Sequence, residues 1–263
     1  MNILEKIAAN KAREIELRKK IIPRSLLENT QLFKRPTFSL ADSLASSDFG
    51  IIAEHKRRSP SKGTINHSIP IADVVEGYAN AGVSGISVLT DTTYFGGSVD
   101  DILLARASVS TPLLRKEFIL DEYQIIEAKS IGADAILLLA SMLSAEEIKK
   151  FAVLALKLGM ESLLEVRDFE ELDRSMCSEI SLIGVNNRNL KDFKTDISTS
   201  IEMAQHIPSE CIMVSESGLD DAKTVAELRR AGYRGFLIGE HFMKTDDPGK
   251  AAKTFMDEIK EAL

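Results

Sequence analysis

The sequence is poor in the residues that crosslink small secreted domains or hold metal ions. Its 263 residues include two cysteines, four histidines and no tryptophan. Cys177 and Cys211 lie far apart and have no His or Cys neighbour at ligand spacing, so we expect neither a disulfide framework nor a metal site. Such sparse cysteine usage is typical of a reducing compartment, and we therefore expect a cytoplasmic protein.

Long apolar runs and an excess of positive charge are also missing. No stretch approaches the about 20 apolar residues of a membrane-spanning helix, and the charged start MNILEKIAANKAREIELRKK does not resemble a signal peptide. The formal net charge is −7, which disfavours nucleic acid because binding its phosphates needs a basic face. We expect neither a nucleic-acid nor a membrane partner, although an amphipathic membrane-surface helix is an alternative for the first segment.

A short apolar run followed by a helical pattern occurs eight times from residue 49 onward. The runs are GIIAEHK, GISVLT, PLLRKEF, AILLLA, ESLLEV, ISLIGVNN, CIMVSES and FLIGE, and they begin at Gly50, Gly85, Pro112, Ala135, Glu161, Ile180, Cys211 and Phe236. Apolar strands separated by amphipathic helices indicate a parallel sheet covered by helices. This number of units, without a GxGxxG motif after the first strand, favours an α/β fold of the (β/α)₈ TIM-barrel type over an open doubly wound sheet.

Residues 1–48 precede the first unit and have a different pattern. Ile3, Leu4, Ile7 and Ala8 recur at helical spacing, so we expect an N-terminal helical extension packed on the barrel. Length does not demand a second domain, because barrels of this size form one unit. The sequence therefore predicts a single domain over residues 1–263.

Helix boundaries within the barrel are indicated by capping residues and glycines. Helical patterns follow Asp121, Ser144 and Asp220, and each pattern ends at a glycine. Aspartate and serine accept hydrogen bonds from the first free N–H groups of a helix, and glycine tolerates the left-handed turn that ends one. We expect helices to begin after these three residues.

Polar residues end six of the eight apolar runs, where a barrel builds its active site. Since side chains alternate along a strand, Glu54 and Lys56 share one face and His55 takes the other, while Lys116 enters the mouth and Arg115 turns toward the helices. The same alternation predicts seven converging side chains: Glu54, Lys56, Lys116, Glu165, Asn186, Arg188 and Glu216. Each alone could be merely solvated or paired, but together they would shift pKa values as acid–base chemistry requires.

Glycines follow the last two apolar runs, in SESG and FLIGE. Barrels often bind phosphate with these two loops, so Ser217, Gly218, Gly239 and Glu240 are candidate phosphate ligands. The alternative is that the glycines merely permit tight turns. The first loop, KRRSPSKG, is either an anion-binding flap that closes over the substrate, which we favour, or an ordinary solvated loop.

Seven segments resemble the indole-3-glycerol phosphate synthase family, in the family's order and over essentially the whole chain. They are IIAEHKRRSPSKG, SVLTDTTYFGGS, LLRKEFILDEYQI, LLEV, IGVNNRNL, VSESG and FLIGE. The resemblance implies a carboxy-lyase of tryptophan biosynthesis that closes 1-(2-carboxyphenylamino)-1-deoxyribulose 5-phosphate to indole-3-glycerol phosphate with loss of CO₂ and water. It implies a sugar-phosphate substrate and no cofactor. We expect a monomer or weak homodimer.

The resemblance also implies roles for single residues. Lys116 is similar to the general acid that protonates the ribulose carbonyl, and Glu165 to the group that serves dehydration. Lys56 steers the substrate carboxylate or shares the acid role, while Glu54 and Asn186 orient and stabilise developing charge. The binding residues implied in the same way are Ser59, Arg188, Glu216, Ser217, Gly218, Gly239 and Glu240.

The apolar slot for the aromatic ring is expected at Leu89, Phe95 and Phe118, whereas core packing explains Leu137 at least as well. Glu240 departs from the family, in which many members carry a small hydroxyl residue, so we expect backbone donation there with the side chain turned away. Two other functions stay open from the residues alone. One is an isomerase of phosphoribosyl anthranilate, and the other is a noncatalytic sugar-phosphate sensor on the same fold.

Overall fold

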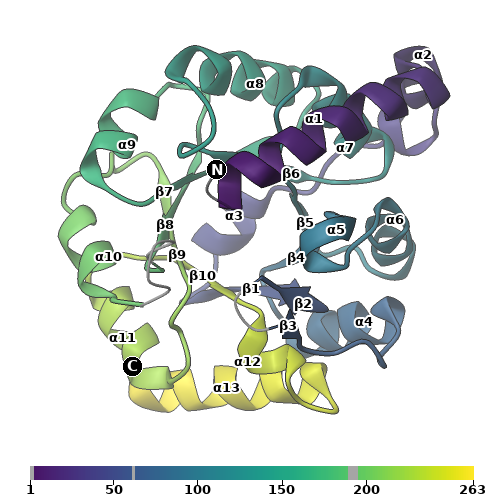
Figure 1. Ribbon diagram of the computed structural model, residues 1–263. Coiled ribbons are helices and arrows are strands. Elements are labelled where there is room, and N and C mark those ends of the chain that lie inside the picture. Colours follow the sequence, from purple (N-terminus) through teal and green to yellow (C-terminus); the bar gives the residue numbers. More distant parts are fainter. Residues whose placement is uncertain (1–2, 61–62, 189–194) are drawn as a thin grey trace.

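Eight parallel strands form a closed barrel in the computed structural model, which describes residues 3–60, 63–188 and 195–263. Around the barrel the strands follow the order β1-β10-β9-β8-β7-β6-β5-β4. Their bounds are β1 (Gly50–His55), β4 (Gly85–Leu89), β5 (Leu113–Lys116), β6 (Ala135–Leu139), β7 (Glu161–Val166), β8 (Leu182–Asn186), β9 (Ile212–Glu216) and β10 (Gly235–Ile238). The predicted TIM barrel is confirmed, and Figure 1 shows the strands inside a ring of helices.

Helices connect successive strands and cover the outside of the barrel. They are α4 (Ile71–Ala81), α6 (Val99–Ser108), α7 (Glu122–Ser130), α8 (Ala145–Lys157), α9 (Phe169–Ser175), α10 (Ser198–Met203), α11 (Ala222–Arg230) and α13 (Pro248–Ala262). Short elements decorate the loops after strands: the hairpin of β2 (Arg58–Ser59) and β3 (Gly63–Thr64), and the helices α5 (Thr92–Phe95) and α12 (Glu240–Met243). Among the described helices, none combines the length and apolar character needed to cross a membrane.

Two of the three predicted helix starts are confirmed, and the third is shifted by one residue. Asp121 and Ser144 each form a capping box, in which the side chain accepts a hydrogen bond from the third helical N–H group and the third residue bonds back. For α11 the prediction of Asp220 was wrong, because Asp221 accepts the hydrogen bond from the N–H of Thr224 at 3.0 Å. Asp220 and Asp221 are adjacent and of the same type, so the residue type alone does not indicate which of them caps the helix.

Side chains from alternate positions of the strands fill the barrel interior. Ile52 is fully buried there and packs in the same cluster as Leu114, Leu163 and Val214. A second, larger cluster lies between the strands and the outer helices. Because the interior is packed, the end of the barrel where the strands finish is the place for a ligand.

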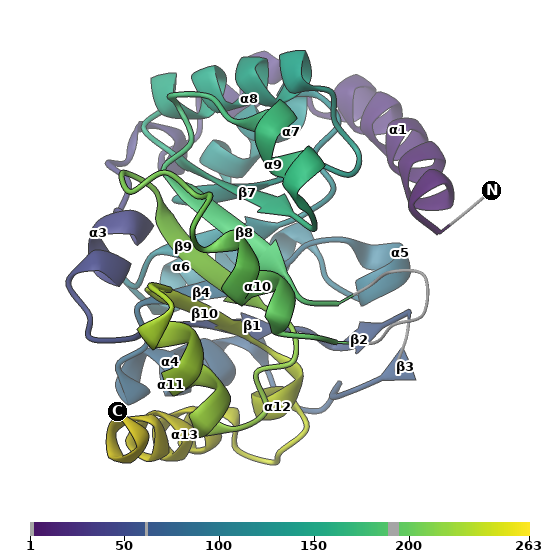
Figure 2. The same ribbon diagram turned by 90° about the vertical axis from the view of Figure 1, so that its left-hand side faces the viewer.

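The N-terminal extension contributes α1 (Ile3–Ile21), α2 (Arg24–Glu28), a 3₁₀ turn (Leu32–Lys34) and α3 (Leu40–Ala45). Helix α3 closes the base of the barrel, where Leu40 and Leu44 are fully buried in the interior cluster. Glu161 fixes it by accepting the N–H groups of Leu40 and Ala41 at 2.8 and 2.9 Å. Figure 2 shows α3 at one end of the barrel and α5 with the β2–β3 hairpin at the other.

Candidate active site

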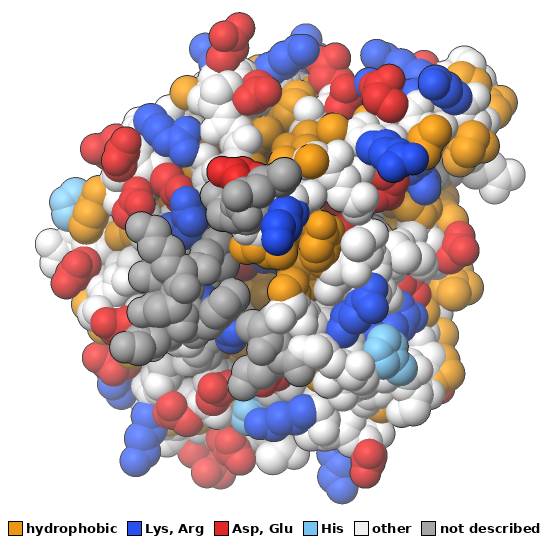
Figure 3. Space-filling view, viewed as in Figure 1, with side chains coloured by type: hydrophobic (Ala, Val, Ile, Leu, Met, Phe, Trp, Pro, Cys, Tyr) orange, Lys and Arg blue, Asp and Glu red, His pale blue; other side chains and the backbone are white. Residues whose placement is uncertain are grey.

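A cavity of about 410 Å³ opens where the strands end, and it brings together every candidate named from the sequence. These lining residues are Glu54, Lys56, Ser59, Leu89, Phe95, Lys116, Phe118, Leu137, Glu165, Asn186, Arg188, Glu216, Ser217, Gly218, Gly239 and Glu240. Ile3, Leu4 and Ile7 of α1 form part of its wall. In Figure 3, hydrophobic side chains gather near the middle of this face, with Lys or Arg side chains beside them.

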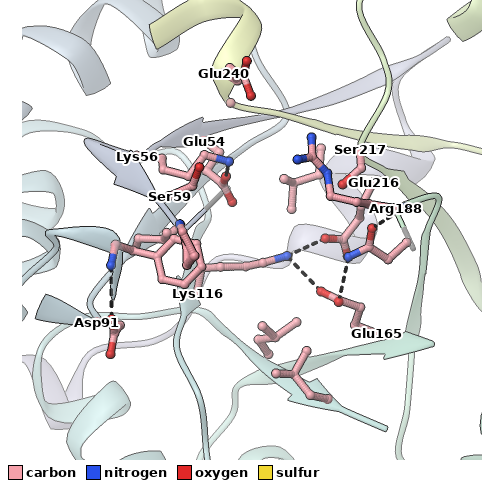
Figure 4. A pocket seen from close by; sticks show the side chains of 18 of the residues that line it. Glu54, Lys56, Ser59, Asp91, Lys116, Glu165, Arg188, Glu216, Ser217 and Glu240 are labelled. Atoms are coloured by element: carbon pink, nitrogen blue, oxygen red, sulfur yellow. Dashed lines mark hydrogen bonds and ion pairs between the residues drawn. The ribbon is translucent and has the colours of Figure 1, made fainter. Parts of the chain in front are cut away.

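Lys116, at the end of β5, reaches into the centre of the cavity between two carboxylates. Its Nζ lies 3.2 Å from Oε2 of Glu165 and donates a second hydrogen bond to Oε2 of Glu216. Oε1 of Glu165 accepts a hydrogen bond from Nδ2 of Asn186 at 2.9 Å, so β5, β7, β8 and β9 meet in one network (Figure 4). Arg115 points the other way and bonds Glu127 of α7 at 2.6 Å, as strand alternation predicted.

Glu54, at the end of β1, forms a second and smaller network. Its Oε1 accepts a hydrogen bond from Nζ of Lys56 at 2.8 Å, and its Oε2 accepts one from the hydroxyl of Ser87 at 3.2 Å. The side chain packs closely on β10, because a Cβ added to Gly239 would lie 2.9 Å from Oε1 of Glu54. A glycine at position 239 therefore leaves the space that the Glu54 carboxylate occupies.

The charges of the site shift the pKa values of three central groups. Burial alone would raise the pKa of Glu54, but Lys56 and Lys116 outweigh it and hold that pKa below its ordinary value. Burial raises the pKa of Glu216 to about 7, since the opposing effect of Lys116 is partly cancelled by Glu165. The pKa of Lys116 is raised in spite of burial, because Glu216, Glu165 and Glu54 surround it. Lys116 is therefore a cation here, and Glu216 is the carboxyl group closest to taking a proton.

The apolar side of the cavity is organised by a buried ion pair that the sequence did not reveal. The rings of Phe95 and Phe118 lie 5.9 Å apart. Asp91 accepts the N–H of Phe95 at 3.2 Å, and Glu117 accepts the N–H of Phe118 at 2.8 Å. Both carboxylates face Lys11 of α1, whose Nζ lies 3.2 and 3.1 Å from them. The N-terminal extension thus fixes the aromatic wall.

The loop after β9 has an unusual backbone where phosphate binding was predicted. Ser217 has φ of 69° and is the only non-glycine residue with positive φ in the described chain, and Gly218 follows with φ of 73°. A side chain at Gly218 would clash, because an added Cβ would lie 2.4 Å from Cγ2 of Thr195. Figure 4 places Glu240 away from the cluster of Lys116 and Glu165.

The first loop uses its arginines to hold neighbouring segments. Arg57 bonds Asp101 of α6 through both terminal nitrogens at 2.5 and 2.7 Å. Arg58 donates to the carbonyl oxygens of Thr92 and Thr93 at 2.6 Å each. Residues 61–62 of the predicted flap lie outside the described residues, and closure over a substrate stays a prediction.

The comparisons with known proteins agree with the geometry of this cavity. The family profile described as indole-3-glycerol phosphate synthase matches residues 4–255. The indole-3-glycerol phosphate synthase of Bacteroides thetaiotaomicron is 47% identical over 259 residues, which cover 98% of this chain and 99% of that protein. That of Salinibacter ruber is 39% identical over 263 residues, which cover 99% and 97%.

The chain belongs to the indole-3-glycerol phosphate synthase family. Like the family, it is a carboxy-lyase of tryptophan biosynthesis that converts a phosphorylated small molecule to indole-3-glycerol phosphate. The isomerase and sensor alternatives are therefore set aside. In the described residues, no group of three or more His, Cys, Asp or Glu side chains is arranged to hold a metal ion.

Solved structures of other proteins share the barrel of this synthase but little of its sequence. A thiamine phosphate pyrophosphorylase from Pyrococcus furiosus matches with a TM-score of 0.60 and 13% identity, over 86% of this chain and 100% of that chain. A structure described as native KDPGal matches with a TM-score of 0.61 and 14% identity, over 82% and 97%. These likenesses concern the fold alone.

Several residues that shape the synthase's cavity were missed in the sequence. Ser87 lies inside an apolar run, and nothing nearby marks it as a partner of Glu54. Gly184 provides the space for Glu216, because an added Cβ would lie 2.3 Å from Oε1 of that residue. Asn187 was overlooked beside Asn186, although the doubled asparagine in GVNNRNL was a usable signal.

Proposed function

We propose that Lys116 is the general acid of ring closure and that Glu165 transfers protons during dehydration. The observation that carries the assignment is the position of the Lys116 ammonium group, which lies in the cavity beside Glu165 and Glu216. The three carboxylates around it raise its pKa and keep it protonated, as a proton donor must be before the reaction. Strands β5, β7 and β9 hold these groups, so their positions are set by the barrel rather than by a loop.

The reaction needs a group that protonates the carbonyl oxygen during ring closure and a group that transfers protons during dehydration. The aromatic carbon that carries the carboxylate attacks the ribulose carbonyl carbon, a C–C bond forms, and the carbonyl oxygen takes a proton from Lys116. Loss of CO₂ then returns the bonding electrons to the ring. The new hydroxyl group leaves as water after accepting a proton, and removal of a ring proton completes the indole. Glu165, bonded to Lys116 and Asn186, lies where it can exchange these protons.

The remaining cavity residues bind and orient the substrate in this proposal. Leu89, Phe95 and Phe118 form the slot for the aromatic ring. Lys56 steers the substrate carboxylate or shares the acid role, while Glu54 holds Lys56 through a 2.8 Å hydrogen bond. Glu54 and Asn186 orient and stabilise the developing charge. The other proposed binding residues are Ser59, Arg188, Glu216, Ser217, Gly218, Gly239 and Glu240. At the phosphate end, backbone N–H groups supply the donors.

Indole fluorescence tests the assignment of Lys116, since the chain contains no tryptophan to interfere. Adding the carboxyphenylamino-deoxyribulose phosphate to the wild type should give a time-dependent rise. Lys116→Met should abolish the rise but leave phosphate-ligand affinity largely intact, because Glu216 can take up a proton when the lysine is lost. Lys149→Met, which replaces an exposed lysine of α8, should turn over normally. Near-normal kcat in Lys116→Met would remove Lys116 from the acid role.

We further propose that the enzyme acts in the cytoplasm, as a monomer or weak homodimer, and that residues 1–263 form one domain. Both cysteines are free thiols, which suits a reducing compartment. The burial of Leu40 and Leu44 inside the barrel supports a single folding unit. Sedimentation equilibrium over a range of protein concentrations tests the oligomeric state.

A further inference from the structure

Asn187 lies directly after β8 and is buried, with 4% of its surface exposed. It does not line the cavity, yet each hydrogen-bonding group of its side chain has a partner. Nδ2 donates to the hydroxyl of Ser215 at 2.9 Å and to the carbonyl oxygen of Ser217 at 3.1 Å. Oδ1 accepts the hydroxyl proton of Ser200 at 2.7 Å. The side chain therefore connects α10 and β9 with the loop after β9.

The backbone that Asn187 holds is one that a serine rarely adopts. Ser217 has φ of 69°, and left-handed backbone conformations are disfavoured for residues with a side chain unless surrounding contacts hold them. The hydrogen bond from Asn187 is a contact of this kind. Ser217 and the following Gly218 both line the cavity, and the Asn187 side chain, which does not line it, hydrogen-bonds the backbone of this wall.

The direction of one peptide group follows from this hydrogen bond. In a trans peptide, the C=O and the N–H of the next residue point in opposite directions. The Ser217 carbonyl points toward the buried Asn187, so the N–H of Gly218 in the same peptide points away from Asn187, and Gly218 itself lines the cavity. Successive backbone N–H groups of a turn can form concave sites for anions.

We propose that Asn187 is a positioning residue for the substrate phosphate, because its side-chain amide fixes the peptide that presents the Gly218 N–H. The inference rests on the proposed phosphate site. The Asn187 side chain makes two donor bonds and one acceptor bond, which a carboxamide can supply, whereas a carboxylate of the same shape has no donor. The network continues behind it, because the Ser200 carbonyl accepts the hydroxyl proton of Tyr233 at 2.8 Å.

The test is a titration with inorganic phosphate, followed by NMR of protein labelled with ¹⁵N in its 15 glycines. In the wild type, the Gly218 amide resonance should shift as phosphate binds. Asn187→Asp keeps the shape but removes both donors, and it should raise the Kd for phosphate about tenfold, the effect of misplacing one hydrogen bond to a charged group. With substrate, the same variant should raise KM more than it lowers kcat, since the phosphate lies away from the reacting atoms.

Two matched controls separate positioning from a general loss of structure. Ser215→Ala removes one acceptor of Asn187 and leaves the bond to Ser217, whereas Tyr233→Phe loosens the far end of the network. Both should bind phosphate as the wild type does. Asn187→Ser, whose hydroxyl is too short to reach the Ser217 carbonyl, should reproduce the weakening if Asn187→Asp does not fold.

Two results would overturn the proposal in distinguishable ways. If Gly218 responds to phosphate in the wild type and the Asn187 variants bind phosphate equally well, the positioning role is wrong and the phosphate site stands. If phosphate inhibits the wild type but leaves the Gly218 resonance unmoved, the proposed phosphate site is itself misplaced, and Asn187 loses its role with it.

Discussion

The protonation state of Glu216 affects how readily Lys116 gives up its proton. Burial raises its pKa to about 7, so it changes charge near neutral pH. Below that value the neutral acid leaves the Lys116 proton easier to release. Above it, the ionised carboxylate raises the pKa of Lys116 and repels an anionic substrate.

We therefore expect kcat/KM to fall as the pH rises through an apparent pKa near 7 that belongs to the cluster of Glu216, Glu165 and Lys116. Glu216→Gln keeps the size of the side chain but removes its titration, so this inflection should disappear. The measurement is the pH profile of kcat/KM for both proteins. An inflection of the same pKa in Glu216→Gln would assign the titration to another group.

At the scale of elements, a buried cation helps to join α1 to the mouth of the barrel. Lys11 is 2% exposed, and its Nζ contacts the carboxylates of Asp91 and Glu117 that hold the backbone at the two aromatic residues of the slot. Burial alone would lower the pKa of Lys11, but Glu117, Glu14 and Asp91 raise it, so the group is charged. The helix and the aromatic wall are thus coupled by charge.

Lys11→Met should loosen α1 and disorder the aromatic wall, because it removes the cation that faces the buried carboxylates of Asp91 and Glu117 and leaves Glu117 with Arg115, at 3.9 Å, as its ion-pair partner. Breaking a buried ion pair in this way costs about 3–5 kcal/mol. We expect KM to rise more than kcat falls, together with faster proteolytic cleavage within α1. Lys6→Met, at an exposed position of the same helix, is the matched control. Unchanged KM and cleavage in Lys11→Met would show that the ion pair does not organise the slot.

At the scale of the whole molecule, strand period and strand-end chemistry were enough to predict the barrel and to place Lys116 and Arg115 on opposite faces. Alternation states which face a residue takes, but not which residue it meets across the barrel. The pairing of Lys116 with Glu216, and of Glu54 with Ser87, therefore needed the three-dimensional structure. The same holds for α3, whose two leucines are buried inside a barrel formed by distant strands.

Global stability should also depend on pH through His55, the last residue of β1, which is 1% exposed. Burial and then the nearby Arg57 lower its pKa to about 4, from an ordinary value of 6.5 in the unfolded chain. Between these values the unfolded chain binds a proton that the folded protein does not. The titration of His55 therefore leaves the free energy of unfolding unchanged above pH about 6.5. As the pH falls from there to about 4, it lowers the free energy of unfolding by at most about 3 kcal/mol.

Urea unfolding at pH 7 and pH 5 measures the contribution of His55 to the free energy of unfolding. The wild type should lose more free energy of unfolding over the interval than His55→Gln, which cannot titrate. His206→Gln, at an exposed histidine, should lose as much as the wild type. Equal losses in all three proteins would mean that His55 does not contribute to acid sensitivity.

The attachment of α3 has a consequence for the order in which a newly made chain becomes structured. Glu161 binds the start of this helix at Leu40 across 121 residues of sequence. The helix leaves the ribosome early, but its binding site at the base of the barrel exists only after β7 has been synthesised. Contacts of such long sequence separation form late because the intervening chain must first be ordered. One of the first segments to be made is thus among the last to be fixed, and it seals the base of a barrel built after it.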